Sequence, residues 1–204
     1  MPAELAPVTV AALDGQMTWF ADMRARVAPV SVVAPDAGPD LVWDPASGDL
    51  LAGVDVVARG IDGAAIGAAA DRFAALREIK RLAGRGAQTV RMAPDDRVHH
   101  AGALVEVQIP DVAGRALAAF NLAGDGTVQM LYPLKGEPPV PQGDAVRLPV
   151  RVSPPYGADQ VIAVSAAAPM PSLVDALSAL DGTRNAGKIT DVLGRFMPPD
   201  ARLG

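Results

Sequence analysis

Residues 117–165 constrain the fold more than any other part of the chain, because their pattern indicates β-strands throughout. Two short apolar runs, 116–122 and 127–132, are separated by a turn that contains Gly-Asp-Gly. Glycine supplies the positive φ angles that tight hairpin turns need, so these runs predict a β-hairpin. Two further strands are predicted over 145–152 and 160–166. The stretch therefore predicts a small antiparallel unit.

Prolines and glycines mark the limits of these strands. Pro133 closes the second strand, because proline has no N–H to donate to a ladder. The residues that follow, 134–143, are rich in proline and glycine and predict a surface loop. The run Pro154-Pro155-Tyr156-Gly157 predicts a turn between the last two strands. An alternating apolar pattern over 98–109 predicts the first strand of the unit.

The β unit also resembles a known family. Its hairpin, its Leu-Pro strand, its Pro-x-Gly-x-Asp turn and its last apolar strand are similar to an uncharacterised bacterial domain that is often found C-terminal to caspase-like cysteine peptidase domains. The resemblance covers about 97–169, and the upstream segments 41–60 and 71–83 resemble the region between peptidase and accessory domain in such proteins. The matching residues are Gly126, Val128, Leu131, Tyr132, Pro133, Leu148, Pro149, Pro155, Gly157 and Asp159.

Strands and helices alternate before this unit. Strands are predicted at 8–13, 30–33 and 88–92, and a hairpin at 41–44 and 49–60, in which Val54, Val56 and Ala58 form the apolar face. Asp14 is expected to cap a helix over 16–27, with Met17, Phe20, Met23 and Val27 directed inward.

The strongest helix is predicted over 63–83, capped by Asp62 and ended by Gly84-Arg85-Gly86. Its apolar stripe is Ile66, Ala69, Phe73, Leu76, Ile79 and Ala83, whereas Arg72, Arg77, Glu78, Lys80 and Arg81 are expected mostly on its other faces. After residue 169, Ser172 is expected to cap a helix over 173–180. A second helix follows over 183–196, and 197–204 is predicted to be a frayed tail.

These elements predict an α+β protein: a small mixed sheet with covering helices, an antiparallel β-sandwich-like domain and a C-terminal helical tail. The predicted divisions are an α+β unit at 1–93, the sandwich-like domain at 94–169, and helices that pack on it at 170–204. The boundary is placed at Pro94-Asp95-Asp96, where turn-forming residues separate the two patterns.

Composition excludes several classes of function. The net charge of -5 provides no basic surplus to neutralise phosphates, so nucleic acid is not an expected partner. The absence of cysteine excludes disulfides, thiolate metal sites and a cysteine nucleophile. No apolar run approaches the roughly 20 residues of a membrane-spanning helix, and the first residues do not resemble a signal peptide. The compartment stays open, with the cytoplasm favoured.

Few residues suggest catalysis or metal binding. His99 and His100 are adjacent, and adjacent residues on a strand point to opposite faces, so they are not expected to share a metal ion. Asp95, Asp96, Asp125 and Asp159 are carboxylates for acid–base chemistry only if the fold brings two together, and each lies where turns favour aspartate.

The remaining candidates have structural explanations. Gly60-Ile61-Asp62-Gly63 precedes a helix but lacks the spacing of a phosphate-binding loop, and Gly84-Arg85-Gly86 is explained as a helix end. No serine has a nucleophile-elbow setting, and those considered are Ser153, Ser165 and Ser172. Tyr132 and Tyr156 flank turns, where they are expected to pack on the sandwich or to anchor a partner. No catalytic, cofactor or metal residue is therefore predicted.

The resemblance implies a non-catalytic accessory or regulatory region whose partner is a caspase-like peptidase domain in cis or in trans. Peptidase activity itself is not expected, because a Cys-His dyad needs a cysteine. The loop at 134–143 and the Tyr156 turn are the first surfaces expected to bind a partner. Two alternatives stay open: a hydrolase that uses aspartates at the junction of the two units, and a small-ligand or glycan-binding module, which the aromatic content of 4% disfavours.

Overall fold

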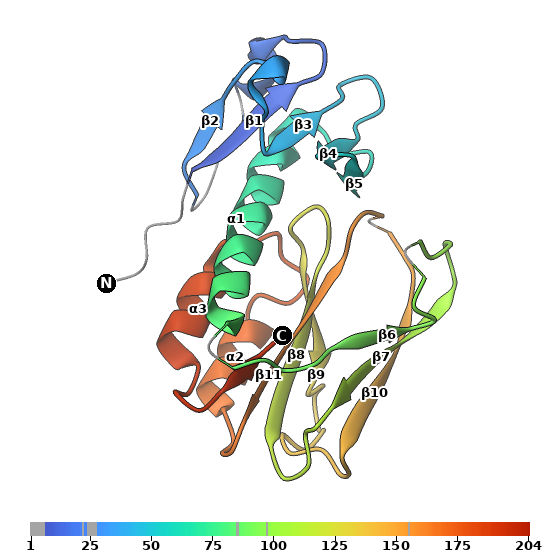
Figure 1. Ribbon diagram of the computed structural model, residues 1–204, viewed down its shortest axis with the longest axis vertical. Coiled ribbons are helices and arrows are strands. Elements are labelled where there is room, and N and C mark those ends of the chain that lie inside the picture. Colours follow the sequence, from blue (N-terminus) through green and yellow to red (C-terminus); the bar gives the residue numbers. More distant parts are fainter. Residues whose placement is uncertain (1–6, 22, 24–27, 85, 97, 155) are drawn as a thin grey trace.

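The computed structural model describes residues 7–21, 23, 28–84, 86–96, 98–154 and 156–204. These residues form three β-sheets and three α-helices, so the protein has the predicted α+β fold. A mixed sheet, sheet A, lies at one end of the molecule, and two antiparallel sheets, B and C, lie at the other (Figure 1). The long helix α1 (Ile66–Ala83) runs between the two ends.

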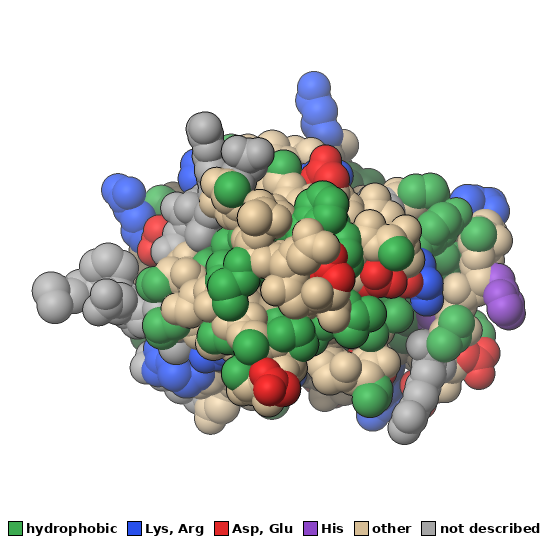
Figure 2. Space-filling view, turned by 90° about the horizontal axis from the view of Figure 1, so that it is seen from above, with side chains coloured by type: hydrophobic (Ala, Val, Ile, Leu, Met, Phe, Trp, Pro, Cys, Tyr) green, Lys and Arg blue, Asp and Glu red, His purple; other side chains and the backbone are tan. Residues whose placement is uncertain are grey.

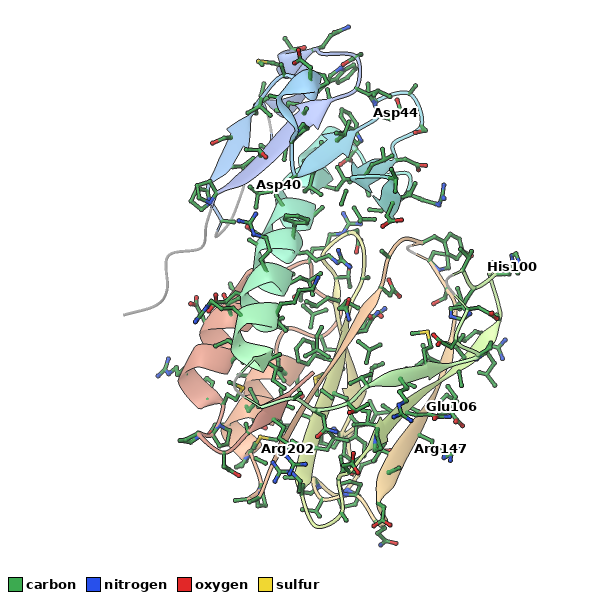
Figure 3. All side chains as sticks on the ribbon, viewed as in Figure 1. Asp40, Asp44, His100, Glu106, Arg147 and Arg202 are labelled. Atoms are coloured by element: carbon green, nitrogen blue, oxygen red, sulfur yellow. The ribbon has the colours of Figure 1, made fainter. Side chains whose placement is uncertain are left out.

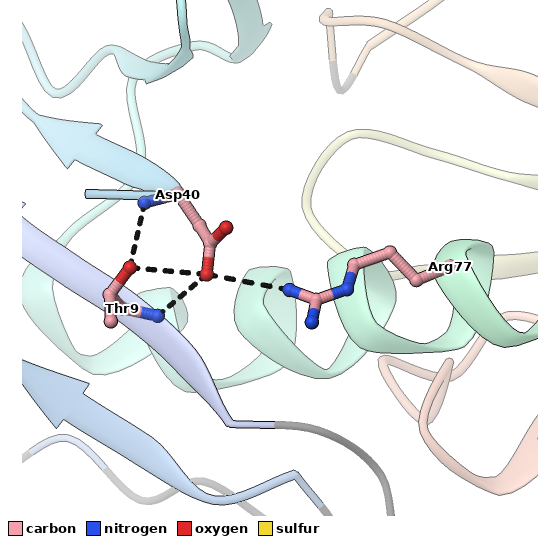
Figure 4. Close-up of polar contacts among 3 residues, drawn as sticks. All are labelled: Thr9, Asp40 and Arg77. Atoms are coloured by element: carbon pink, nitrogen blue, oxygen red, sulfur yellow. Dashed lines mark hydrogen bonds and ion pairs between the residues drawn. The ribbon is translucent and has the colours of Figure 1, made fainter. Parts of the chain in front are cut away.

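Sheet A is built from the first five strands. Its spatial order is β2 (Val30–Val32), β1 (Val8–Ala12), β3 (Leu41–Trp43), β4 (Leu50–Ala52) and β5 (Asp55–Ala58). β1 is parallel to both of its neighbours, and β4 and β5 extend the sheet in antiparallel fashion. Polar contacts join the segments next to these strands to α1, and one of them is an ion pair at Asp40. Asp40 Oδ2 accepts hydrogen bonds from Thr9 N (2.9 Å) and Thr9 Oγ1 (3.1 Å) and lies 3.4 Å from Arg77 Nη1 (Figure 4).

The first predicted helix is much shorter than expected. Among its described residues, only Met17–Phe20 are helical, as the 3₁₀ turn η1, and residues 22 and 24–27 lie outside the described part of the chain. Asp14 does not act as a helix cap, because Oδ1 accepts from Gln16 N and Oδ2 accepts from Trp19 Nε1. Met17 is 55% exposed, so it does not belong to an inward stripe.

The predicted strand at 49–60 is two strands, because the chain turns at Gly53-Val54 between β4 and β5. The alternation that placed Val54 on the apolar face was wrong there, and Val54 is 94% exposed. A turn interrupts the alternation of inward and outward side chains along a strand, so the buried residues of β5 are Val57 and Ala58.

The helical segment begins at Gly63, as the sequence predicts, but its first turn is 3₁₀ and α1 itself begins at Ile66. The 3₁₀ turn η3 (Gly63–Ala65) leads into it, and Asp62 Oδ1 accepts a hydrogen bond from Ala65 N. Its first half packs on sheet A, and its last turns pack on sheet B with Ile79 and Leu82. The charged residues of α1 are expected mostly on the faces outside the apolar stripe, but the face that carries Arg72 is not solvated. α1 is covered from two sides, and Arg72 is 5% exposed.

Sheets B and C contain the predicted hairpin and its partners. Sheet B has the order β12 (Arg202–Leu203), β11 (Gln160–Ala166), β8 (Ala116–Leu122) and β9 (Val128–Tyr132). Sheet C has the order β10 (Ala145–Arg151), β7 (Leu104–Pro110) and β6 (Arg91–Ala93). The residue-94 boundary falls between β6 and β7, which pair with each other, so the β unit includes residues before it.

Sheet B is the middle layer of this part of the molecule. One face packs on α1, α2 (Pro171–Ser178) and α3 (Lys188–Phe196), and the other packs on sheet C (Figure 1). All seven residues of β8 are buried, with Phe120 facing the helices and Leu117 facing sheet C. Burial of a side chain such as Phe120 contributes about 2–3 kcal/mol.

Three details of the C-terminal region differ from the predictions. Ser172 does not cap α2, which begins at Pro171 after Met170 and has no side-chain cap. The second helix begins at Lys188, five residues later than predicted. The last residues are not a frayed tail, because β12 pairs with β11 and Leu203 is buried.

Candidate functional site

The parallel strands β1 and β3 are neighbours in sheet A, and their carboxyl ends lie side by side, where Ala12 is paired with Trp43. β2 lies on the other side of β1, so the connection that leaves β1 and the connection that leaves β3 run in opposite directions from these ends. In open sheets of parallel strands, such a divergence leaves a crevice at the carboxyl ends, and ligands bind there. A hollow of about 430 Å³ lies at this place and is called the tryptophan hollow here. Its lining residues are Trp19, Trp43, Pro45, Ala46, Ser47, Gly48, Gly60, Ile61, Asp62 and Gly63.

Both tryptophans of the chain line this hollow. Their rings meet edge to face, with centroids 5.7 Å apart and an interplanar angle of 80°. Trp43 is buried, and its Nε1 donates to Ile61 O at 3.2 Å, which fixes the ring as the floor. Trp19 is 44% exposed, so it forms a wall that solvent can reach.

Backbone contacts hold the walls of the hollow together. Ile61 N donates to Gly48 O at 2.9 Å, which joins the β3–β4 turn to the segment before η3. A Cβ atom on Gly63 would lie 2.9 Å from Trp19 O, so the approach of η1 to this segment requires glycine. The hollow is therefore built by three segments that are far apart in sequence.

Three aspartates lie in the lining or near it in sequence. Asp14 follows β1, Asp44 follows β3, and Asp62 lines the hollow itself. The hydrogen bond from the Ser47 hydroxyl is the main cause of a lowered pKa of Asp44, and a hydrogen bond from Ala46 N lowers this pKa further. Asp49 forms an ion pair with Arg59 at 3.0 Å. This end of the molecule has hydrophobic side chains interspersed with acidic ones (Figure 2).

Exposed apolar side chains extend this surface beyond the hollow. Leu13 and Met17 are 59% and 55% exposed, and both lie within a few residues of Trp19. The backbone N–H of Leu13 donates to Trp43 O at 2.8 Å, which places it beside the floor residue.

A second polar feature lies where α1 meets the β unit. Arg72 Nε donates to Leu122 O at 3.4 Å, and its Nη2 donates to Ala158 O. Burial lowers the pKa of Arg72, and the nearby carboxylates of Asp159 and Asp125 oppose that effect. Two of the four predicted aspartates are thus brought near one buried cation.

Both of these carboxylates are engaged in structural contacts. Asp125 is buried, and its Oδ2 lies 2.9 Å from Arg184 Nε while its Oδ1 accepts from Thr127 N. Asp159 Oδ2 accepts from Asn121 Nδ2 at 3.2 Å. Loss of water around the carboxyl raises the pKa of Asp159, although the hydrogen bond from Asn121 and the charge of Arg72 lower it.

A groove between sheets B and C passes Asp159. It has a volume of about 420 Å³ and lies between β11 and the segment that leads into β6. The Asn121 side chain is buried beside Asp159, and its Oδ1 has no hydrogen-bond partner among the described residues. Asn121 is not among the residues that line the groove, so the two features do not form one site.

The two histidines do not come together. They lie in the loop before β7 rather than on a strand; the His99 Nε2 atom is buried, whereas His100 is exposed at the outer end of sheet C (Figure 3). The described residues contain no group of three or more histidine, aspartate or glutamate side chains that could hold a metal ion.

The other candidates are dispersed over the fold. Asp95 and Asp96 are exposed and lie in the loop after β6. Ser165 is buried on β11, where its hydroxyl donates to Gln88 Oε1 at 2.6 Å and accepts from Arg115 Nε at 3.1 Å. Ser153 and Ser172 are exposed.

The glycine-rich segments have structural positions. Gly60 and Gly63 line the tryptophan hollow, where Gly63 permits the approach of η1. Gly84 follows the last residue of α1 as its C-cap, and Gly86 N donates to Ala83 O at 3.2 Å, as expected of a helix end. Arg85 of this segment lies outside the described residues.

The predicted binding surfaces of the β unit are mostly exposed, although internal contacts anchor each of them. Leu117 N donates to Pro139 O at 2.9 Å, and the Tyr132 hydroxyl donates to Pro138 O, so the 134–143 loop is joined to sheet B. Tyr156 is 40% exposed, but its carbonyl accepts from Arg59 N at 3.1 Å. Pro155 of this turn lies outside the described residues.

Sequence reasoning missed both the tryptophan hollow and the buried position of Arg72. A signal for the hollow was present in the sequence. Aromatic residues are few, yet the two tryptophans, Trp19 and Trp43, lie within 25 positions of each other. Scans against protein-family models, curated proteins and solved structures each returned no match. No helix among the described residues is long and apolar enough to cross a lipid bilayer.

Proposed function

We propose that this chain is a non-catalytic protein-binding region that acts as an accessory or regulatory part of a caspase-like peptidase system. The observation that carries the binding role is the tryptophan hollow with its exposed neighbours Leu13 and Met17. Tryptophan is enriched at the energetic centres of protein interfaces, because it buries a large area and loses little conformational entropy. An exposed tryptophan beside a fixed, buried one is therefore suited to anchor a partner.

The peptidase as partner rests on the sequence resemblance of the β unit. The motif residues that can be described have structural roles there: Gly126 lies in the β8–β9 turn, and the Tyr132 hydroxyl binds the 134–143 loop. Such residues specify a fold rather than a chemistry, so they support a common architecture with the accessory domain. The proposed partner is a peptidase domain in cis or in trans.

The alternative functions have less support. A hydrolase would need two carboxyl groups free to exchange protons with a substrate, with separated pKa values. The carboxylate of Asp125 contacts Arg184 and Thr127, and that of Asp159 contacts Asn121. Both carboxylates therefore stabilise the junction between α1 and the β unit. The groove beside Asp159 leaves room for a small ligand, but the aromatic surfaces that glycans favour lie at the tryptophan hollow instead.

Site-specific photo-cross-linking tests the proposal. We expect the photo-reactive amino acid p-benzoylphenylalanine at position 17, beside the hollow, to cross-link one protein in source cells. The same probe at position 104 provides the matched control, because Leu104 is 62% exposed on sheet C. Cross-linking from position 17 should disappear in the Trp19→Ala background. If positions 17 and 104 give the same products, the binding role is contradicted; if mass spectrometry identifies a protein other than a peptidase, the peptidase assignment is contradicted.

A further inference from the structure

The tryptophan hollow offers a ligand aromatic faces and carboxylates but few hydrogen-bond donors. Both indole N–H groups are already used, that of Trp43 by Ile61 O and that of Trp19 by Asp14 Oδ2 at 2.9 Å. The backbone N–H groups of Gly48 and Ile61 in the lining are also used. A ligand that needs donors, such as a phosphate or a carboxylate, therefore finds little to bind.

The charges at the hollow have one predominant sign. Asp62 is the single charged residue among those that line it, and its Oδ2 has no partner among the described residues. Asp14 and Asp44 follow the carboxyl ends of β1 and β3, and Asp14 Oδ2 accepts a hydrogen bond from the lining residue Trp19. Arg59, which precedes the lining residue Gly60, is paired with Asp49. The formal charges around the hollow therefore favour a cation over an anion.

The ring of Trp19 strengthens this preference. Cations are attracted to the face of an indole ring, and tryptophan binds them better than the other aromatic residues do. The hydrogen bond from Trp19 Nε1 to the Asp14 carboxylate places negative charge at the edge of the same ring. Trp43 packs edge to face against Trp19 and holds the ring in place.

We infer that the hollow binds an arginine or lysine side chain of a polypeptide segment, with the cation over Trp19 and near Asp62. This inference deepens the proposed protein-binding function and rests on it. A polypeptide fits better than a free amine, because Leu13 and Met17 provide apolar contacts outside the hollow for residues next to the cation. Charge complementarity then sets both the class of partner and its orientation.

Peptide titration of the intact chain tests this inference. The probes are three capped pentapeptides with leucines around a central arginine, citrulline or glutamate, and binding is followed by tryptophan fluorescence. Citrulline has nearly the shape of arginine without its charge. We expect the arginine peptide to bind about tenfold more tightly than the citrulline peptide, and the glutamate peptide to bind least. The difference should shrink in high salt.

Asp62→Asn is the decisive variant, because asparagine caps a helix as well as aspartate does and removes only the charge. We expect it to reduce the arginine preference severalfold and to leave the thermal midpoint unchanged. Asp96→Asn changes the net charge equally at a distant exposed site, so it should have no effect.

The failures of the two proposals are distinguishable. Equal binding of the arginine and citrulline peptides overturns the cation inference, and so does the absence of arginine-peptide binding at millimolar concentration. After either result, the cross-linking from position 17 still tests the protein-binding role on its own. An arginine preference that persists unchanged in Asp62→Asn and is matched by Asp96→Asn would also overturn the inference, because the site charge would then not matter.

Discussion

Arg72 is a buried cation that joins α1 to two turns of the β unit. Its guanidinium donates to the carbonyls of Leu122 and Ala158 and is attracted by two carboxylates. A buried charge is costly to remove from water, and here the two hydrogen bonds and the two nearby carboxylates offset that cost. Loss of one partner leaves the others uncompensated in a place that water cannot reach.

We therefore expect Arg72→Met to lower the free energy of unfolding by about 3 kcal/mol, measured by urea denaturation. Arg77→Met is the matched control on the same helix. The Arg77 side chain is 41% exposed, and its ion pair with Asp40 spans 3.4 Å, so its loss should cost no more than about 0.5 kcal/mol. Similar losses for the two variants would contradict the structural role given to Arg72.

The burial of Arg72 shows where helix periodicity stops being informative. The apolar stripe of α1 correctly predicted inward positions such as Ile66 and Ile79. That reasoning assumes one buried face and one solvated face. α1 packs on sheet A and on sheet B from different sides, so a residue outside the stripe can still be covered. Such a position depends on tertiary contacts that no local pattern records.

At the scale of elements, β12 is the clearest addition to the predicted fold. Leu203 is 1% exposed in the core between sheet B and the helices, and its N–H donates to Gly86 O at 2.9 Å. Gly204 and Ala163 exchange two backbone hydrogen bonds beside it. The end of the chain therefore closes one edge of sheet B.

Leu203→Ala should lower the free energy of unfolding by about 2–3 kcal/mol, because it leaves a cavity in that core. Arg202 is the matched control in the same strand, since its side chain lies on the exposed face (Figure 3). Arg202→Ala should change stability by less than about 0.5 kcal/mol. Chemical denaturation followed by circular dichroism distinguishes the two. A loss below 1 kcal/mol for Leu203→Ala would show that the last residues are dispensable to the fold.

The predictability of each element follows its local signals. The β8–β9 hairpin was predicted from its Gly-Asp-Gly turn, and α1 was predicted from its aspartate cap. Both signals lie within a few residues of the element that they determine. A two-residue strand such as β12 has no periodicity to detect. The short spacing of the two tryptophans was the one sequence signal for the tryptophan hollow. Its walls could not be predicted, since η1, the β3–β4 turn and the segment before η3 meet only through tertiary contacts.

At the scale of the whole molecule, sheet A docks on the β unit through close backbone contacts. Ala158 N donates to Val57 O at 3.0 Å, and Ala58 forms a bridge with Gly157. A Cβ atom on Gly157 would lie well inside van der Waals distance of Val57 O. Together with α1, which contributes to the cores at both ends, these contacts predict that the chain unfolds as one cooperative unit.

The two tryptophans make this prediction measurable, because both report on the sheet A end, whereas far-ultraviolet circular dichroism reports on the whole chain. The two signals should give the same urea midpoint. Gly157→Ala should lower both midpoints together, by about 1–3 kcal/mol of stability, because the added methyl group forces β5 away from the turn. Gly194→Ala is the control: it lies in α3 with open space around it, so it should be neutral or stabilise by up to about 1 kcal/mol. If Gly157→Ala moves the tryptophan transition and leaves the circular dichroism transition in place, the two ends of the molecule unfold separately, and the shared role of α1 is wrong.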